Sequence, residues 1–383
     1  MNKFFIDKTN LNFIDPSKLK NFDITIKSIP ANYKLIGFKN VNAIVKDINN
    51  KLLNQGCLVV DKNVFNIYFK NKITFDLKRI FIVNAKESNK NIETVLKICS
   101  FYSKHNINKG SKLFIVGGGI LQDLGGSASY LFKRGIPWTY IPTTLLGISD
   151  SCLGGKTAVN FNTYKNLLGL FSAPKEVILS CDFIKTLSPE DISCGYGEIF
   201  RLAITGGVKS FNFFKKNIDN SLNGSKSALE DLIKYSLMVK KAVIEEDEYE
   251  INIRKSMNYG HTIGHALEAM TNYKIPHGIG VAIGILIENN LAQELKLMDK
   301  HLCDEIFEQA KKIIEKKYIK LLAKCSFNNI AEHLSKDKKT IGNKANYTYL
   351  KKMGDMQFSY NDITKTKKII SESKNLIVSK LQN

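Results

Sequence analysis

The 383-residue sequence lacks the features of several specialised classes of protein. No apolar run approaches the roughly 18 to 20 residues needed to span a bilayer, so we expect no membrane contact. The opening stretch, MNKFFIDKTNLNF, lacks the apolar core of a secretory signal peptide. The seven cysteines are an odd number without a CxxC pair, which argues against a disulfide framework or a zinc ribbon. These absences indicate a cytoplasmic protein.

Arginine is also scarce. The net charge of +20 comes almost entirely from lysine, because Arg79, Arg134, Arg201 and Arg254 are the only arginines. The lysines are spread along the whole chain instead of gathering in a patch with interleaved aromatic residues, so no nucleic-acid partner is expected. A basic surface still attracts anionic substrates.

Short apolar runs alternate with helical patterns over the first half of the chain. Buried strands are expected within residues 57–60, 79–85 and 137–144, and an amphipathic helix over 92–105. This alternation predicts an α/β domain with a Rossmann-like parallel sheet, residues 1–180. Ser188 and Pro189 then start a helix, and helical periodicity dominates a mainly α-helical domain, residues 181–383. Two domains with a cleft between them are the expected architecture.

Three glycines, Gly117, Gly118 and Gly119, directly follow a predicted strand in LFIVGGGILQD. Glycine lets a backbone approach a pyrophosphate, and the next helix offers N–H donors. Gln122 replaces the last glycine of the dinucleotide fingerprint, so a plain tight turn is the alternative. Asp61 ends an earlier strand and is of the type that accepts hydrogen bonds from ribose.

A second glycine-rich segment, ISDSCLGGKTAVN followed by YKNLLG, suits an anionic group. It carries Asp150, Lys156, Lys165 and Asn166. Lysines held on such a loop favour phosphate, and an ordinary solvated loop is the alternative.

Three histidines lie within NYGHTIGHALEAMTNYKIPHGIG. His261 and His265 are four residues apart and share a helical face, and a turn-like break precedes His277. This layout is compatible with a transition-metal site, and helix-borne histidines that are solvated or satisfied in the core are the alternative. Glu198 lies on the helix that begins at Ser188, where a buried carboxylate needs a charged partner or a metal.

Glu250, Arg254 and Asn258 are spaced by four and are predicted to line one helical face that continues towards the histidines. Lys240 and Lys241 precede them. Such a stripe favours a polar active-site wall over a merely solvated face.

These motifs carry a family resemblance. GGGILQD, KRGIPW, IPTTLL, DSCLGGKTAVN, KNLLG, GEIFR, DEYEINIRKSMNYGHTIGHALEA and PHG occur in the order and spacing of the 3-dehydroquinate synthases, a branch of the sugar phosphate cyclases. The resemblance runs from about residue 57 to 284, and more weakly to 355.

The resemblance implies NAD and a divalent metal, zinc or else cobalt, with Glu198, His261 and His277 as ligands. It implies catalytic and substrate-contacting roles for Asp150, Lys156, Lys240, Glu250, Arg254, Asn258 and His265. Phosphate and substrate contacts would include Lys156, Lys165, Asn166, Arg201, Lys338 and Lys339. NAD would be held by Asp61, Glu87, Lys90, Gly117, Gly118, Gly119, Asp123, Thr143 and Thr144. In this family an arginine crosses from the partner subunit, and Arg134 matches it, so a homodimer is expected.

The implied activity is cyclisation of 3-deoxy-D-arabino-heptulosonate 7-phosphate to 3-dehydroquinate in the shikimate pathway. Arg201 stands where the family has lysine, and Ile279 replaces an acid that follows His277 and Gly278. These departures keep open a related cyclase acting on another sugar phosphate, such as sedoheptulose 7-phosphate (2-epi-5-epi-valiolone synthase-like). A metal-dependent alcohol dehydrogenase of the same fold is a further alternative.

Overall fold

The chain folds into two compact units. The computed structural model describes residues 2–6, 9–16, 19, 22–29, 31–52, 55–162, 164–335 and 340–382. Leu19–Leu187 form the N-terminal unit, and Met1–Lys18 with Ser188–Asn383 form the C-terminal unit. These limits differ from the predicted boundary after residue 180, and the first residues of the chain are grouped with the C-terminal unit.

The N-terminal unit is built on a seven-stranded sheet in the order β3-β4-β11-β8-β7-β5-β6. All neighbouring strands are parallel except β3, which pairs antiparallel with β4 at the edge. The strands are β3 (Ile24–Ile26), β4 (Tyr33–Gly37), β5 (Gly56–Asp61), β6 (Ile80–Val83), β7 (Lys112–Gly117), β8 (Thr139–Pro142) and β11 (Glu176–Leu179). The predicted Rossmann-like parallel sheet is confirmed.

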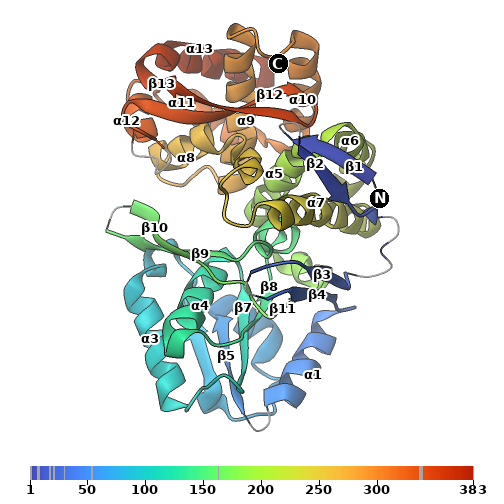
Figure 1. Cartoon of the computed structure of the whole chain (residues 1–383), viewed down its shortest axis with the longest axis vertical. Helices are drawn as coiled ribbons and strands as arrows, with labels where there is room; N and C mark the ends of the chain where they lie inside the picture. Colours follow the sequence, from blue (N-terminus) through green and yellow to red (C-terminus); the bar gives the residue numbers. More distant parts are fainter. Residues whose placement is uncertain are drawn as a thin grey trace. The chain divides into compact units, whose positions relative to one another are not determined.

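Helices cover both faces of this sheet. Helices α3 (Ile92–Lys104) and α4 (Gly119–Leu131) lie on one side and α1 (Val41–Leu52) on the other (Figure 1). Right-handed crossovers between parallel strands produce this distribution. Because both faces are covered, β5 is buried along its whole length, as its apolar run predicted.

Shorter elements complete the N-terminal unit. The antiparallel ribbon of β9 (Lys156–Phe161) and β10 (Tyr164–Phe171) packs on α4 through β9. The remaining segments are α2 (Lys62–Val64), η2 (Phe65–Phe69), η3 (Leu77–Arg79), η4 (Glu87–Asn89), η5 (Phe132–Arg134), η6 (Gly147–Ser151) and η7 (Cys181–Thr186).

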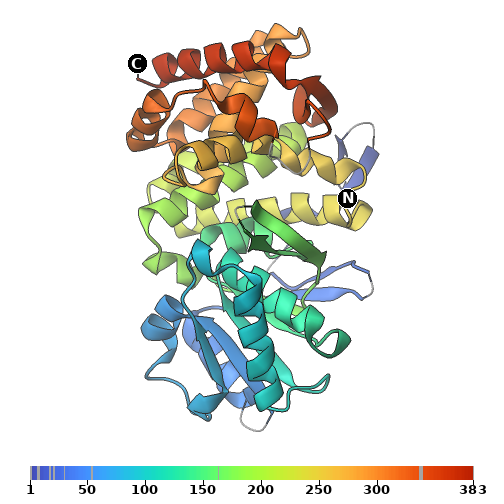
Figure 2. The same ribbon diagram turned by 90° about the vertical axis from the view of Figure 1, so that its left-hand side faces the viewer.

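The C-terminal unit is mainly helical, as predicted. Its helices are α5 (Pro189–Thr205), α6 (Gly207–Leu222), α7 (Lys226–Glu246), η8 (Ile253–Asn258), α8 (His261–Met270), α9 (His277–Glu294), α10 (Lys300–Ile313), α11 (Lys316–Lys324), α12 (Ile330–Ser335) and α13 (Ile363–Gln382). Helix α9 is apolar on all sides because α5, α8, α10 and α13 all pack against it. Helix α13 forms the outer layer of this unit (Figures 1 and 2).

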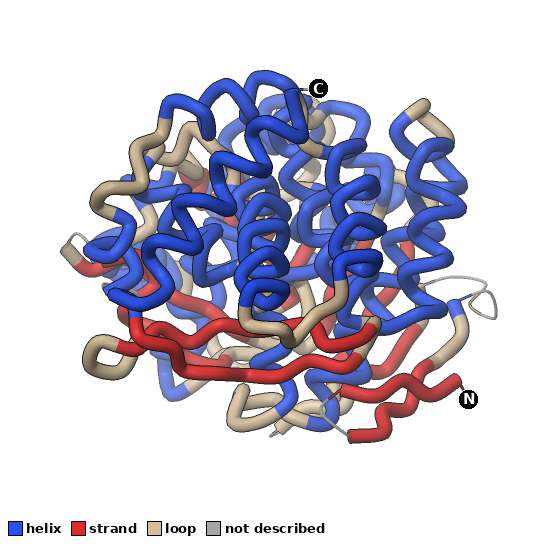
Figure 3. The backbone as a smooth tube through the Cα atoms, turned by 90° about the horizontal axis from the view of Figure 1, so that it is seen from above, coloured by secondary structure: helices blue, strands red, loops and turns tan. Residues whose placement is uncertain are grey.

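Two antiparallel ribbons flank these helices: β12 (Lys344–Lys352) with β13 (Asp355–Asp362), and β1 (Asn2–Ile6) with β2 (Thr9–Phe13). The sequence pattern assigned no helix or strand to residues 1–30. The β1–β2 ribbon, visible beside the N terminus in Figure 3, packs on α7. Phe13 is 4% exposed, and its ring lies 5.0 Å from that of Tyr235, which stacks on Phe213 at 4.6 Å. In the described residues, no helix has the length and apolar character needed to cross a membrane.

The packing of Phe13 gives a first prediction. Phe13→Ala removes the ring that attaches the ribbon to α7 and leaves a cavity. We expect the free energy of unfolding of the C-terminal unit to fall by about 3 kcal/mol in urea titrations followed by circular dichroism. Tyr360→Ala is the matched control in the same unit, because that aromatic ring is 45% exposed and its loss should change little. Equal effects of the two variants would contradict this packing role.

Candidate active site

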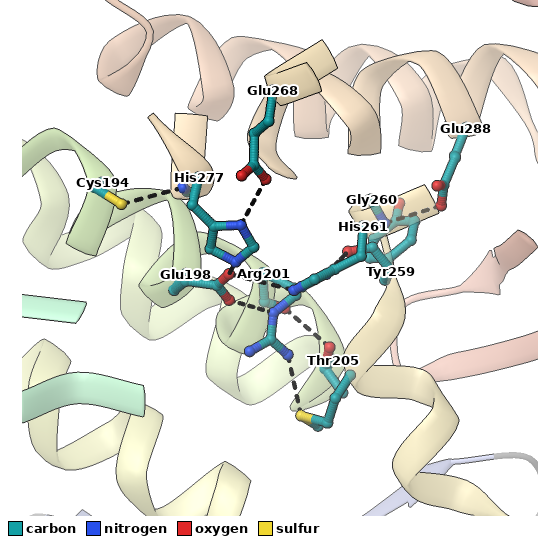
Figure 4. Close-up of polar contacts among 12 residues, drawn as sticks. Cys194, Glu198, Arg201, Thr205, Tyr259, Gly260, His261, Glu268, His277 and Glu288 are labelled. Atoms are coloured by element: carbon teal, nitrogen blue, oxygen red, sulfur yellow. Dashed lines mark hydrogen bonds and ion pairs between the residues drawn. The ribbon is translucent and has the colours of Figure 1, made fainter. Parts of the chain in front are cut away.

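Three side chains from three helices of the C-terminal unit converge on one point. Glu198 lies within α5, His261 is the first residue of α8, and His277 is the first residue of α9. The Nε2 atoms of His277 and His261 lie 3.1 and 3.5 Å from Oε1 of Glu198. Figure 4 shows both imidazoles directed at this carboxylate. The structure therefore brings together the three residues expected to bind a metal.

His265 joins the same group. Its ring lies 5.4 Å from that of His261 and 5.7 Å from that of His277, as expected for residues on one face of α8 and across from α9. One ring nitrogen from each of the three histidines lies within 4.8 Å of the other two. The geometry by itself admits all three imidazoles as ligands beside Glu198.

The donor set fits a divalent transition metal. Oε1 of Glu198 is buried, and no described residue gives it a hydrogen bond of acceptable geometry. A carboxylate oxygen and imidazole nitrogens that share one point are donors suited to zinc or cobalt, and three protein ligands leave a position for substrate. A cation between these groups would satisfy the buried oxygen.

Glycines allow the ligand-bearing helices to touch through their backbones. A Cβ added to Gly197, next to Glu198, would lie 2.0 Å from the carbonyl oxygen of Gly278, and one added to Gly278 would lie 1.9 Å from the oxygen of Cys194. Only glycine permits so close an approach of α5 to the start of α9. This contact sets the separation between Glu198 and His277.

A glycine also sets the position of His261. Gly260 has φ +76°, and its added Cβ would lie 2.4 Å from the carbonyl oxygen of Val281 on α9. The Gly260 N–H donates to Oε2 of Glu288 at 2.9 Å, and Nδ1 of His261 lies 3.2 Å from the carbonyl oxygen of Tyr259. The turn before α8 is thus anchored to α9, which directs Nε2 of His261 towards Glu198.

Charge and burial oppose each other at this point. Burial by itself would raise the pKa of Glu198, but the charges of Arg201 and both histidines hold that pKa well below its usual value. Burial lowers the pKa of His261 well below its usual value, against the pull of Glu198. Burial also acts to lower the pKa of His277, but the neighbouring carboxylates of Glu268 and Glu198 raise that pKa well above its usual value. Glu198 is therefore an ionised, buried carboxylate.

Two side chains contact the metal-ligand candidates in ways that the sequence did not predict: Arg201 was expected to contact phosphate, and Glu268 was not singled out. Arg201 is 2% exposed and donates from Nε to Oε2 of Glu198 at 2.5 Å, so its expected phosphate contact stays a prediction. Glu268 lies 2.7 Å from Nδ1 of His277 and was not predicted. Its position two helical turns after His261, on the same face of α8, was the available signal. Ile279, at the position of the family's acid, is fully buried.

A turn over residues 247–252 and a 3-10 helix over 253–258 precede the histidines, so the single helical stripe predicted for Glu250, Arg254 and Asn258 is wrong. The carboxylate of Asp247 ends α7 by accepting from the backbone N–H groups of residues 251, 252 and 254. Glu250 has φ +62°, and the 3-10 helix η8 follows. Two of these side chains still meet, because Nδ2 of Asn258 donates to Oε1 of Glu250. Nη1 of Arg254 donates instead to the backbone carbonyl of Glu248. Lys240, on α7, is 8% exposed.

The residues expected to hold NAD lie at the carboxyl ends of adjacent strands of the N-terminal unit. Asp61 ends β5, the glycine turn follows β7, and Thr143 and Thr144 follow β8. A Cβ added to Gly119 would meet nothing within 4 Å, and the first turn of α4 has no side-chain cap. Open space beside uncapped N–H groups fits a pyrophosphate. Asp61 Oδ1 accepts from the N–H groups of residues 63 and 64.

Gln122, the departure from the dinucleotide fingerprint, has a structural use. Its amide donates to the carbonyl oxygen of Ser151 at 2.7 Å and accepts from the Ser151 hydroxyl at 2.9 Å. These bonds tie α4 to η6, which carries Asp150. Asp150 is 9% exposed.

A polar network joins predicted NAD-contacting and phosphate-contacting residues. Nζ of Lys90 lies 2.5 Å from both Oδ2 of Asp123 and Oδ1 of Asn166. Lys165 lies 3.6 Å from Glu87. Lys156 begins β9 and is exposed. Their ligand contacts stay predictions, but the structure joins Lys90, Asp123 and Asn166 directly. Lys338 and Lys339 lie outside the described residues.

Arg134 lies on a strained turn. Lys133 and Arg134 have φ +50° and +60°, values that L-residues rarely adopt, and Gly135 follows with φ +100°. The Arg134 side chain is exposed and makes no hydrogen bond or ion pair within the described part of the chain. Strained backbone of this kind is concentrated at functional sites.

Family models match both units. The model of the 3-dehydroquinate synthase N-terminal part matches residues 80–194, and that of the C-terminal part matches residues 195–340. The chain belongs to the 3-dehydroquinate synthase family. The 3-dehydroquinate synthase of Pelagibacter ubique (strain HTCC1062) is 36% identical to this family member over 333 residues, which cover 82% of this chain and 87% of the relative.

Two solved sugar phosphate cyclases have the same fold as this 3-dehydroquinate synthase family member. One is 2-deoxy-scyllo-inosose synthase complexed with carbaglucose-6-phosphate, NAD⁺ and Co²⁺, with a TM-score of 0.77 and 22% identity over 91% of this chain and 99% of that one. The other is 2-epi-5-epi-valiolone synthase from Streptomyces hygroscopicus subsp. jinggangensis 5008 with NAD⁺ and Zn²⁺ bound, with a TM-score of 0.77 and 20% identity over 92% and 98%. At these identities they confirm the predicted fold.

The glycine contact gives the second prediction. Gly197→Ala places a methyl group against the backbone of Gly278, so α5 and α9 must move apart. We expect a loss of about 3 kcal/mol in the stability of the C-terminal unit and markedly weaker binding of Co²⁺ in a spectroscopic titration. Gly110→Ala is the control, because its Cβ would meet only the Asn108 side chain, at 3.3 Å. Undiminished Co²⁺ binding by Gly197→Ala would show that the close contact does not position the ligands.

Proposed function

We propose that the protein is a 3-dehydroquinate synthase. It would convert 3-deoxy-D-arabino-heptulosonate 7-phosphate to 3-dehydroquinate, with elimination of phosphate, as a cytoplasmic enzyme of aromatic amino acid biosynthesis. The observation that carries this proposal is the meeting of Glu198, His261 and His277 around one buried oxygen in a chain of this family.

Glu198, His261 and His277 would hold the divalent metal, zinc or cobalt, and the glycine turn after β7 would hold NAD. When bound, NAD takes up and returns a hydride and the metal polarises a substrate oxygen. The two structural neighbours contain NAD⁺ with Co²⁺ or Zn²⁺, which supports these cofactors.

The chain's own side chains would orient the substrate and balance its charge. Lys156, Lys165 and Asn166 would hold the phosphate until it leaves. Lys240 and Arg254 would hold the carboxylate, for which a planar guanidinium has matching geometry. Asp150, Glu250, Asn258 and His265 would contact the hydroxyl groups of the sugar. In this arrangement the substrate's own phosphate takes the proton during elimination, so the protein contributes orientation and charge.

A related sugar phosphate cyclase is the second candidate. The observation that favours it is Arg201, which stands where the family has lysine and is buried against Glu198 instead of exposed to a ligand. A changed cation beside the metal ligand would suit a different sugar phosphate, such as sedoheptulose 7-phosphate.

We also propose a homodimer in which Arg134 reaches the phosphate in the partner's active site. The exposed guanidinium on a strained turn supports this role, since strain is tolerated where function requires it. The dimer would be two-fold symmetric, so each subunit would give one arginine and receive one.

The third prediction tests the reaction. Purified protein incubated with 3-deoxy-D-arabino-heptulosonate 7-phosphate, NAD and Zn²⁺ should release inorganic phosphate without net accumulation of NADH, because the hydride returns to the product. His277→Ala, which removes a metal-ligand candidate, should reduce the rate by at least about a hundredfold. Phosphate release is followed colorimetrically and NADH by its absorbance at the same time.

The outcomes separate the candidates. Faster release from sedoheptulose 7-phosphate would favour the related cyclase. Steady accumulation of NADH with a simple alcohol would indicate an alcohol dehydrogenase. Absence of phosphate release from both sugars would overturn the proposal of a cyclase.

The fourth prediction tests the crossing arginine. Arg134→Ala and His277→Ala should each be nearly inactive alone. In a 1:1 mixture allowed to exchange subunits, one site of each mixed dimer combines an intact His277 with the partner's intact Arg134, so about a quarter of the wild-type activity should return. A mixture that forms mixed dimers by native mass spectrometry but stays inactive would contradict a role for Arg134 in the partner's site.

A further inference from the structure

One metal-ligand candidate is held by a carboxylate from a different helix. Oε1 of Glu268, on α8, lies 2.7 Å from Nδ1 of His277, the first residue of α9. The opposite ring nitrogen, Nε2, faces Glu198 Oε1 at 3.1 Å. Figure 4 shows the imidazole of His277 between the two carboxylates. The ring is therefore held at one nitrogen and directed with the other.

The contact sets the tautomer of His277. An ionised carboxylate can only accept a hydrogen bond, so Nδ1 must carry the proton. The lone pair of a neutral imidazole then lies on Nε2, the nitrogen that points into the site. A carboxylate paired in this way with a ligating histidine fixes the orientation of the ring and increases its basicity.

Glu268 is itself held by its surroundings. It is 7% exposed, and its Cγ lies 3.6 Å from the position that a Cβ on Gly280 of α9 would take. Its backbone carbonyl accepts from the N–H of Tyr273 at 2.8 Å, within the turn that leads to His277. The 3.6 Å separation is an ordinary van der Waals distance, so the Glu268 side chain packs closely against α9.

We propose that Glu268 is the positioning residue of the metal site, which holds His277 in the tautomer and orientation that bind the cation. The inference rests on the proposed function, since it takes His277 as a ligand. It assigns to α8 a second contribution: His261 binds the metal directly, and Glu268 acts through His277. Ile279, where the family places an acid, is buried and apolar, so α8 supplies the carboxylate that orients His277.

The experiment measures metal binding separately from turnover. Metal-free wild-type protein and the variants Glu268→Gln, Glu268→Ala and His277→Ala are titrated with Co²⁺, whose visible absorption reports ligand number and geometry. We expect affinity to fall about tenfold in Glu268→Gln, which still accepts the hydrogen bond, and about a hundredfold in Glu268→Ala. Glu294→Gln, an exposed acid near the end of α9, should bind Co²⁺ like the wild type.

A role limited to folding predicts a different pattern. In that case both Glu268 variants would lower the unfolding temperature of the metal-free protein. Each Glu268 variant that remains folded would bind Co²⁺ with wild-type affinity and spectrum. That result would overturn the inference and leave the proposed function intact. If wild-type protein binds no Co²⁺ or Zn²⁺, the proposed metal site fails instead. Loss of affinity with an altered Co²⁺ spectrum in Glu268→Ala, and partial recovery in Glu268→Gln, would support the positioning role.

Discussion

The buried carboxylate of Glu198 is the constraint on which the C-terminal unit depends. An ionised group is costly to bury unless other charges and hydrogen bonds compensate for the lost water. Arg201 satisfies one oxygen, and the other faces His277 and His261. That second oxygen needs a proton or a cation. The fold therefore maintains a position beside this oxygen that a divalent metal can fill.

Close helix packing makes this arrangement possible. Glycine inside a helix costs about 1 kcal/mol relative to alanine, so glycines at such positions oppose the stability of the isolated helices. In return, Gly197 and Gly278 allow α5 and α9 to meet through their backbones, and Gly260 allows α8 to start against α9. A side chain at any of these positions would separate helices whose metal-ligand candidates lie within a few ångströms of one another. The apolar character of α9 on every side has the same origin, because α5, α8, α10 and α13 all pack against it.

In the N-terminal unit, the direction of the strands brings the candidate NAD-binding residues together. Parallel strands end at one edge of the sheet, so short side chains and backbone groups from β5, β7 and β8 gather there without a long connection. Polar bonds then attach further segments: Gln122 holds η6, and Lys90 holds Asn166. Arg134 lies in η5, and Asn166 lies in β10 where the register of the β9–β10 ribbon shifts, so both unusual backbone conformations are outside the seven-stranded sheet.

Local patterns in the sequence determined the element types. Alternating apolar runs specified the parallel sheet, Ser188 and Pro189 specified the start of α5, and the spacing of His261 and His265 specified their shared face. These elements can be predicted from the sequence because strand burial, helix capping and helical periodicity depend on only a few neighbouring residues. The prediction of Glu198, His261 and His277 as metal ligands, and the roles expected of Asp123 and Asn166, came from motifs matched in order, not from any local rule.

Tertiary structure decided what depends on contacts between distant residues. The spacing of Glu250, Arg254 and Asn258 suggested a helix, but three hydrogen bonds to Asp247 end α7 and form a loop instead. The sequence could not show that the β1–β2 ribbon packs on α7, or that Glu268 on one helix orients His277 on the next. Periodicity describes the faces of a single helix, whereas the partner that each face meets depends on how closely the backbones can approach, and this chain sets that approach with glycines.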